Sequence, residues 1–260
     1  MFRSFAAALY LLSFLTSMTL IAGEAPIIIA HRGASQVAPE NTASSIRAAI
    51  ALAAQVIEFD VRVTRDGELI LFHDDKLDRL TGLPGTIEVS DWAELSTLDV
   101  GSWFSGGGFA GEKLLRFDES LKLCFDAGVT PLIERKTGEA KAYAEVIRSL
   151  EGADRVIVQS FDWEFLADFQ REMPTVPLGA LGSKVLTTEQ LGTLTELRPA
   201  WVGWKVGDLV NDDLAKLHGL GAKIALWTVN DPAVARTWVD LGVEAIITDV
   251  PDVIAAEWEH

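Results

Sequence analysis

The 260-residue sequence has a single cysteine and far fewer basic than acidic side chains. One cysteine cannot form an intramolecular disulfide. This residue, Cys124, lies in the apolar stretch Leu121–Phe125, which has a helical pattern, so we expect a buried small side chain rather than a nucleophile. With 22 bases against 38 acids, the formal charge of −16 argues against binding to nucleic acid or nonspecifically to anionic lipid.

The chain also lacks low-complexity segments, and 49% of its residues are hydrophobic. This length and composition are enough for one large core, so we expect a single domain of α/β-barrel size.

The N-terminal segment has the pattern of an export signal. Arg3 precedes an apolar run over residues 5–22 that is interrupted only by Ser and Thr, and small residues follow it. We predict a secretory signal peptide over residues 1–25 and a domain over 26–260. Because the run is long for a signal peptide, an uncleaved membrane anchor is the alternative. Either interpretation predicts an exported protein, periplasmic or secreted if the leader is cleaved and membrane-anchored if it is not.

From Ile27 onward, short β-branched runs alternate with amphipathic stretches of about ten residues. The expected strands are residues 26–30, 56–63, 130–134, 155–159, 177–181, 200–205, 223–227 and 243–247, and the helices 43–54, 117–127, 139–150, 162–171, 188–197, 212–220, 232–240 and 253–258. Eight strand-then-helix units predict an α/β fold, the (β/α)8 TIM barrel. A doubly wound open sheet is the alternative, but no G-x-G-x-x-G sequence follows the first strand.

Residues 75–116 interrupt this alternation. They are rich in glycine and contain Trp92, Trp103 and Phe104. The segment is too long for a simple connection, so we expect a small insertion after the second strand.

The second expected strand carries two acids where apolar residues are expected. Side chains alternate along a strand, so Glu58 and Asp60 share one face while Phe59 and Val61 share the other. Two carboxylates on one face repel each other unless a divalent cation, a basic side chain or a shifted pKa relieves the repulsion.

Asp66-Gly67, directly after this strand, predicts a tight turn, because glycine takes a positive φ at no steric cost. A short strand over residues 68–72 then returns the chain to His73-Asp74. A histidine thus leaves this hairpin near the point where two carboxylates leave its partner strand. We interpret residues 58–74 as half of an active site.

In a (β/α)8 barrel the active site lies at the C-terminal ends of the strands. Polar and aromatic residues stand at these ends: His31-Arg32, Glu58, Asp60, His73, Glu134-Arg135-Lys136, Gln159-Ser160-Phe161, Lys205, Trp227-Thr228 and Thr248-Asp249. Simpler explanations apply to some of them. Asp249 is interpreted as the N-cap of the last helix, Trp227 as packing and Lys205 as a surface charge.

The sequence contains four histidines. His218 lies in an amphipathic helix and His260 ends the chain, so both are expected to be solvated and inert. His31 and His73 both stand at strand exits, beside acids on neighbouring strands, and this placement is difficult to explain by structure alone.

The residue types suggest a metal-assisted reaction on a phosphate. Glu58, Asp60 and Glu134 supply hard oxygen ligands, which suit one divalent cation, Ca²⁺ or Mg²⁺. Arg32 and Lys136 would offset the charge of a bound phosphate.

His31 and His73 form a natural acid–base pair, since the unperturbed pKa of histidine is about 6.5. One can accept a proton from the attacking hydroxyl while the other protonates the leaving alcohol. The set fits phosphodiester cleavage.

These residues resemble the glycerophosphodiester phosphodiesterase family. The matching motifs are His31-Arg32-Gly33, Pro39-Glu40-Asn41-Thr42, Glu58-x-Asp60-Val61, Thr64-x-Asp66-Gly67, His73-Asp74, Leu98-Asp99-x-Gly101-x-Trp103-Phe104, Glu134-x-Lys136, Trp227-Thr228-Val229-Asn230 and Gly242-Val243 to Thr248-Asp249. They span nearly all of the chain after the leader, in the order that the family has.

The resemblance implies a barrel with an insertion, a divalent cation on the three acids and a general acid–base pair of histidines. It implies that Arg32 and Lys136 bind the phosphate and that Glu40 organises the site. The implied substrate is a small glycerophosphodiester, which yields sn-glycerol 3-phosphate and an alcohol such as choline or ethanolamine. No nucleic acid and no stable protein partner is implied.

Related barrels act as D-type lysophospholipases or cyclise their substrate. An apolar cleft beside Trp103, Phe104 and Phe161 would favour a lipid tail, whereas a narrow polar pocket would favour glycerol. Phe161 and Trp227 are therefore further candidates for contact with substrate. A catalytically silent binding protein on this barrel would be expected to have lost a histidine or an acid, and this chain keeps them all.

Overall fold

The computed structural model describes residues 25–259. The predicted export signal therefore lies, except for Ala25, outside the described residues, as does His260. Among the helices of residues 25–259, none is both long enough and apolar enough to cross a bilayer.

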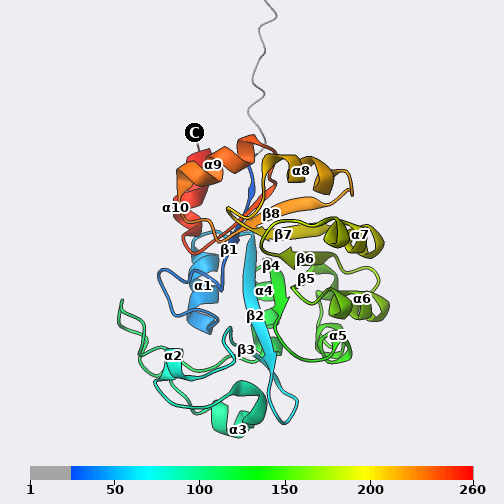
Figure 1. Ribbon diagram of the computed structural model, residues 1–260. Helices are drawn as coiled ribbons and strands as arrows, with labels where there is room; N and C mark the ends of the chain where they lie inside the picture. The colour runs from blue at the N-terminus through cyan, green and yellow to red at the C-terminus, as the bar shows by residue number, and fades with distance from the viewer. Residues whose placement is uncertain (1–24, 260) are drawn as a thin grey trace, which may run out of the picture.

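Eight parallel strands form a closed barrel, because β1 pairs with both β2 and β9 (Figure 1). The barrel strands are β1 (Ile27–Ala30), β2 (Val56–Val63), β4 (Thr130–Arg135), β5 (Ile157–Ser160), β6 (Leu178–Gly182), β7 (Trp201–Lys205), β8 (Lys223–Trp227) and β9 (Ala245–Thr248). Their short, largely buried runs of β-branched residues are typical of parallel strands covered by helices. The predicted (β/α)8 barrel is confirmed, and the open sheet is excluded.

Helices lie between consecutive strands and surround the barrel (Figure 1). They are α1 (Ala43–Ala51), α4 (Phe117–Asp126), α5 (Ala140–Arg148), α6 (Trp163–Glu172), α7 (Thr188–Leu197), α8 (Asn211–His218), α9 (Pro232–Asp240) and α10 (Pro251–Ala255), the last continued by a 3₁₀ turn, Ala256–Trp258. Several predicted boundaries of helices and strands differ from the structure by a few residues. The first helix ends before residue 54 because Ala53 has a φ of 59°, and the last begins earlier, at Pro251, whose fixed φ suits a first helical position.

The main core lies between the outer face of the barrel and the helices. Phe59 from β2 packs edge-on against Phe117 of α4, with ring centroids 6.4 Å apart. Tyr143 of α5 continues this cluster at 5.6 Å from Phe117. Cys124 is buried in the same core, as predicted, and burial raises the pKa of its thiol to about 12.

The inner face of the barrel changes character along its axis. Near the start of the strands it is apolar, with Ile29, Val56, Leu132, Ala225 and Ala245 in one cluster. Because side chains alternate along each strand, the next inward positions continue this face toward the C-terminal end. The apolar cluster therefore lies beneath the polar residues that follow it on the same strands.

An insertion projects from one side of the barrel. Strand β3 (Leu69–Leu71) pairs antiparallel with the end of β2 after a turn at Gly67, whose φ is 88°. The insertion then contains α2 (Asp78–Thr81), a 3₁₀ turn (Ile87–Val89) and α3 (Trp92–Leu95), which lie beside this hairpin in Figure 1. Its members share a small core of their own: Ile70, Phe72, Leu77, Leu80, Ile87, Leu95, Val100 and Leu114.

Close packing between β6 and β7 generates a prediction about stability. A Cβ atom at Gly182 would lie 2.1 Å from the buried indole ring of Trp204, on the neighbouring strand. Gly182→Ala should therefore destabilise the fold by about 1–3 kcal/mol, through overpacking. Chemical denaturation of the purified variant measures this change.

Gly192→Ala is the matched control, because Gly192 lies on an exposed position of α7 with open space around it. It should stabilise the fold by roughly 0.5–1 kcal/mol, since alanine favours a helix more than glycine does. Equal effects of the two substitutions would contradict the packing described between β6 and β7.

Candidate active site

Three carboxylates meet inside the C-terminal end of the barrel. Asp60 on β2 is the register partner of Glu134 on β4, and Glu58 lies one inward position below Asp60. The exposed fractions of Glu58, Asp60 and Glu134 are 1%, 1% and 8%. One oxygen from each carboxylate lies within 4.8 Å of the others. The alternation of β2 that was predicted from the sequence thus places a buried acidic cluster in the barrel.

Two basic side chains lie against this cluster. Lys136 Nζ is 2.6 Å from Glu134 Oε1 and 3.3 Å from Asp60 Oδ1. Arg32 Nε is 3.3 Å from Asp60 Oδ2, and the backbone N–H of Arg32 donates to Glu58 Oε2 at 2.9 Å. These contacts relieve part of the repulsion between the carboxylates. Of the possibilities considered from the sequence, a neighbouring base and a shifted pKa are both found here.

The pKa values of the cluster diverge. Burial, with the charges of Asp60 and Glu134, raises the pKa of Glu58 well above its usual value. Burial and the charge of Asp60 raise the pKa of Glu134 to about 7. Burial acts in the same direction on Asp60, but the charges of Arg32 and Lys136 outweigh it and lower the pKa of Asp60. Full ionisation of all three acids therefore requires more positive charge than the two bases provide.

The cluster fits a hard divalent cation. Its donors are carboxylate oxygens, which Ca²⁺ and Mg²⁺ prefer. Within residues 25–259, Oε1 of Glu58 is buried and has no hydrogen-bond partner. A buried acceptor without a partner costs free energy, and a bound cation would remove that cost.

Both predicted catalytic histidines are oriented by a carboxylate. His31 Nδ1 is 2.7 Å from Asp249 Oδ1, and His73 Nδ1 is 2.6 Å from Asp74 Oδ1. Burial alone would raise the pKa of each aspartate, but hydrogen bonds lower both to about 2, from His31, Asn230 and Ser35 on Asp249 and from Arg79 and His73 on Asp74. An ionised aspartate accepts a hydrogen bond, so each Nδ1 carries a proton and Nε2 of each ring is left for chemistry. Burial lowers the pKa of His73, which favours its neutral form.

The interpretation of Asp249 as a helix cap was wrong. The N-cap of α10 is Val250, and within residues 25–259 no side chain caps this helix. Asp249 instead accepts from His31, from Ser35 Oγ at 3.0 Å and from Asn230 Nδ2 at 2.7 Å. It follows Ile247 on the inward face of β9, and β9 is the register neighbour of β1, whose continuation is His31. This contact forms only when the barrel closes, so a local sequence pattern does not predict it.

Most of the predicted site residues line one cavity of about 190 Å³. Its lining consists of His31, Arg32, Glu58, His73, Glu134, Lys136, Gln159, Phe161, Leu181, Trp227, Thr228 and Ile247. Phe161 and Trp227 meet edge-to-face at 5.5 Å on one wall. Among the described residues, the buried Nε1 of Trp227 has no hydrogen-bond partner. Trp227 therefore lines the cavity and packs there, and its indole N–H is an unused donor.

Two predicted site residues lie just outside this lining. Asp60 is covered by Arg32 and Lys136. Glu40 accepts a hydrogen bond of 2.9 Å from Arg32 Nη1 and borders an open polar depression on the far side of His31. Trp103 and Phe104 belong to the insertion and are not part of the cavity lining.

Two residues that were not predicted to take part in the reaction lie outside the cavity lining. Lys205 is exposed at the end of β7. His218 pairs with Glu244 at 3.2 Å, near the N-terminal end of the barrel.

Sequence reasoning missed Asn41 as a supporting residue. Its amide donates to Asp60 Oδ2 at 2.8 Å and accepts from the backbone N–H of Asp60 at 3.0 Å. Asn41 has a φ of 58°, a conformation that asparagine tolerates better than most residues. Its position in the motif Pro39-Glu40-Asn41-Thr42 was the available signal.

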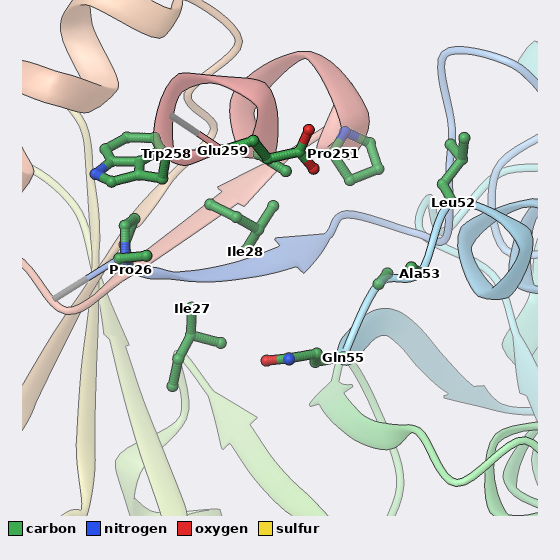
Figure 2. A pocket seen from close by; sticks show the side chains of 12 residues that line it. Pro26, Ile27, Ile28, Leu52, Ala53, Gln55, Pro251, Trp258 and Glu259 are labelled. Atoms are coloured by element: carbon green, nitrogen blue, oxygen red, sulfur yellow. The ribbon is translucent and has the colours of Figure 1, made fainter.

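A larger depression, of about 400 Å³, lies at the opposite end of the barrel (Figure 2). It is bounded by the start of β1, the loop before β2, and α10 with its 3₁₀ turn, including Pro26, Ile28 and Trp258. Its lining contains no histidine, and its ionisable side chain is Glu259. The larger depression therefore lacks the acid–base groups and the acidic cluster found at the C-terminal end.

Comparison with known proteins places these features in context. Residues 31–253 match the sequence profile of the Glycerophosphoryl diester phosphodiesterase family. The chain is 31% identical to a glycerophosphodiester phosphodiesterase of Bacillus subtilis, over 95% of this chain and 94% of that one. It is 30% identical to a glycerophosphodiester phosphodiesterase of Caldanaerobacter subterraneus, over 88% of this chain and 96% of that one.

Solved structures give the same result. A phosphodiesterase of Oleispira antarctica, solved in complex with the product sn-glycerol-3-phosphate, superposes with a TM-score of 0.85. The two are 27% identical, and the match covers 90% of this chain and 97% of the other.

The raised pKa of Glu134 generates a prediction about pH and cations. A carboxyl whose pKa is higher in the folded than in the unfolded state contributes stability that is lost as pH rises. As pH rises from the usual pKa of glutamate to about 7, the free energy of unfolding of the metal-free protein should therefore fall by roughly 1–3 kcal/mol, because Glu134 loses its proton. Saturating Ca²⁺ or Mg²⁺ should restore the stability above pH 7, because binding to the folded state adds about 2.7 kcal/mol at 100 times Kd.

Denaturation curves at several pH values, with chelator or with cation, measure both effects. Glu134→Gln is the control, and it should reduce both the pH dependence and the cation effect. A cation that stabilises wild type and Glu134→Gln equally would argue against binding at this cluster.

Proposed function

The chain belongs to the glycerophosphoryl diester phosphodiesterase family, and on that premise we propose a reaction that uses one divalent cation and two histidines. The family makes it a phosphoric diester hydrolase. The proposed reaction converts a glycerophosphodiester to sn-glycerol 3-phosphate and an alcohol. The observation that carries this proposal is the placement of His31 and His73, each oriented by an aspartate, in one cavity with the acidic cluster.

Glu58, Asp60 and Glu134 would hold a single Ca²⁺ or Mg²⁺. When bound, the cation would add positive charge beside the non-bridging oxygens of the phosphate. Arg32 and Lys136 line the same cavity and would bind the phosphate, Arg32 through its planar fork and Lys136 as a point charge. Glu40 holds the guanidinium of Arg32 from the side away from the cavity.

The two histidines would move the protons of the reaction. For hydrolysis, one Nε2 accepts a proton from the attacking water as the water oxygen forms a bond to phosphorus; in the cyclising alternative, the attacking group is a neighbouring hydroxyl of the substrate. The other ring, protonated on both nitrogens, donates the proton on its Nε2 to the alcohol oxygen as the second phosphorus–oxygen bond breaks. Asp249 and Asp74 each accept from Nδ1–H, so Nε2 of both rings is left for this exchange. Which histidine is the acid and which is the base depends on the side of the cavity from which the alcohol leaves.

The size and lining of the cavity favour a small substrate. A cavity of about 190 Å³ has room for a glycerophosphate group, and a longer group would have to extend into the adjoining open depressions beside His31 and Phe161. Of the three aromatic residues considered for a lipid tail, Trp103 and Phe104 are not in the lining, and Phe161 is. The product complex of the Oleispira antarctica phosphodiesterase supports a glycerol 3-phosphate product for this chain as well.

We also propose that the protein is exported. The proposal rests on the sequence of residues 1–25, and it includes the single domain over 26–260 with an insertion at 75–116.

His31→Ala and His73→Ala should each lower kcat by about 10²–10⁴-fold, because general acid–base catalysis contributes that factor. Release of sn-glycerol 3-phosphate from glycerophosphocholine measures the rate, and the unfolding transition should stay close to that of wild type. His218→Ala, which removes a half-exposed histidine away from the cavity, is the matched control and should retain full activity. Near-normal turnover by either cavity variant would reject the acid–base assignment.

Exhaustive chelation should abolish hydrolysis, and Ca²⁺ or Mg²⁺ should restore it, because Glu58 and Glu134 of the acidic cluster line the reaction cavity. With cation present, glycerophosphocholine and glycerophosphoethanolamine should be cleaved at least about tenfold faster than lysophosphatidylcholine, which corresponds to a barrier difference of roughly 1.4 kcal/mol. Phosphorus NMR of the products separates hydrolysis from cyclisation. Activity that survives chelation, or a preference for the lysophospholipid, would reject the corresponding part of the proposal.

A further inference from the structure

An arginine of the insertion reaches the active site. Arg79 lies on α2, the short helix of the insertion. Its Nε donates to Asp74 Oδ2 at 2.5 Å, its Nη1 to Glu40 Oε2 at 2.9 Å and its Nη2 to Glu40 Oε1 at 2.6 Å. One guanidinium therefore joins two carboxylates from separate segments, Glu40 from the loop before α1 and Asp74 from the chain after β3.

Each of these carboxylates also holds a group of the reaction cavity. The other oxygen of Asp74 is 2.6 Å from Nδ1 of His73. Glu40 Oε1 accepts from Nη1 of Arg32 at 2.9 Å. The side chains His73, Asp74, Arg79, Glu40 and Arg32 thus form one continuous series of charged and polar contacts. At one end is a proposed acid–base group, and at the other a proposed phosphate-binding group.

The position of Arg79 is set by the insertion. Leu77 and Leu80, its neighbours on and beside α2, are buried in the small core of the insertion. On its outer side, the guanidinium lies 6.0 Å from the ring of Trp103, whose Nε1 donates to the carbonyl of Val100. The planar fork of an arginine fixes direction as well as charge, and lysine does not reproduce this geometry.

A solvent-exposed ion pair would have little effect on the reaction. The same insertion provides one for comparison, since Arg65 binds Asp91 through two nitrogens at 2.7 and 2.5 Å. Both of those residues are exposed, and their contact leads to no cavity residue. Arg79 differs because Glu40 is 9% exposed, and because both of its acceptors also bind cavity residues.

We propose that Arg79 is a positioning residue that fixes the imidazole of His73 and the guanidinium of Arg32 relative to each other. The proposal rests on the function proposed for this site. Arg79 is not part of the cavity lining, so it acts through Asp74 and Glu40. The insertion, rather than the barrel, then sets the alignment of a proton-transfer group with the phosphate.

Kinetics of Arg79→Ala test this role. Partners that orient a metal ligand from outside are worth about 10–100-fold in activity, and we expect a fall in kcat of the same size for a residue that orients His73 through Asp74. KM should rise as well, since Arg32 loses the partner that holds Glu40 in place. Arg79→Lys should recover only part of kcat, and added guanidinium at millimolar concentration should partly rescue Arg79→Ala. Arg65→Ala is the matched control and should retain wild-type kinetics.

Two further measurements separate positioning from general loss of structure. Asp74→Asn and Arg79→Ala combined should be no more than about threefold worse than the poorer single variant, because coupled residues are not additive. Nitrogen NMR of the His73 ring reports the tautomer without any turnover. We expect the proton on Nδ1 in wild type and in Arg65→Ala, and a mixture of tautomers in Arg79→Ala.

The outcomes separate this inference from the proposed function. If wild type fails to cleave glycerophosphodiesters while Arg79→Ala still changes the His73 tautomer, the function is wrong and the positioning role stands. If wild type cleaves them and Arg79→Ala matches it in kcat, KM and tautomer, the positioning role is wrong and the function stands. A fall in kcat that Arg65→Ala shares equally would also overturn the role of Arg79.

Discussion

The mutual repulsion of Glu58, Asp60 and Glu134 organises the upper half of the barrel. Three carboxylates within 4.8 Å of one another, all buried, cannot ionise together without positive charge among them. The protein places Arg32 and Lys136 against the cluster, and still Glu134 keeps a pKa of about 7. The remaining deficit of positive charge is what suits the cluster to a divalent cation and the cavity beside it to an anionic phosphate.

The two halves of the barrel interior have different roles. Inward residues early in the strands, such as Val56 and Leu132, form an apolar plug that supports the acids two positions later. Outward residues such as Phe59 pack on the helices and hold the strands in register. The acidic cluster therefore sits on a rigid base, and the free energy of the large outer core compensates for its unfavourable burial.

The histidines and the insertion show which contacts no local pattern contained. His31 and His73 could be selected because both follow strands beside acids, yet their carboxylate partners arise in different ways. Asp74 is the next residue in sequence, whereas Asp249 lies 218 residues away from His31 and was taken for a helix cap. No sequence pattern singled out Arg79, because a basic residue in an irregular insertion resembles any other surface base until the segment is folded.

The sequence by itself determined the fold class, the strand that presents the acids and most of the polar residues that line the cavity. These follow from period-two alternation and from the rule that barrel sites gather at the C-terminal ends of strands, and both are local properties repeated along the chain. Tertiary structure alone decided the partners: Asp249 for His31, Asn41 for Asp60, and Arg79 for Asp74 and Glu40. Such pairings depend on closure of the barrel and on how the insertion folds back. Neither can be predicted from the distance between two residues along the sequence.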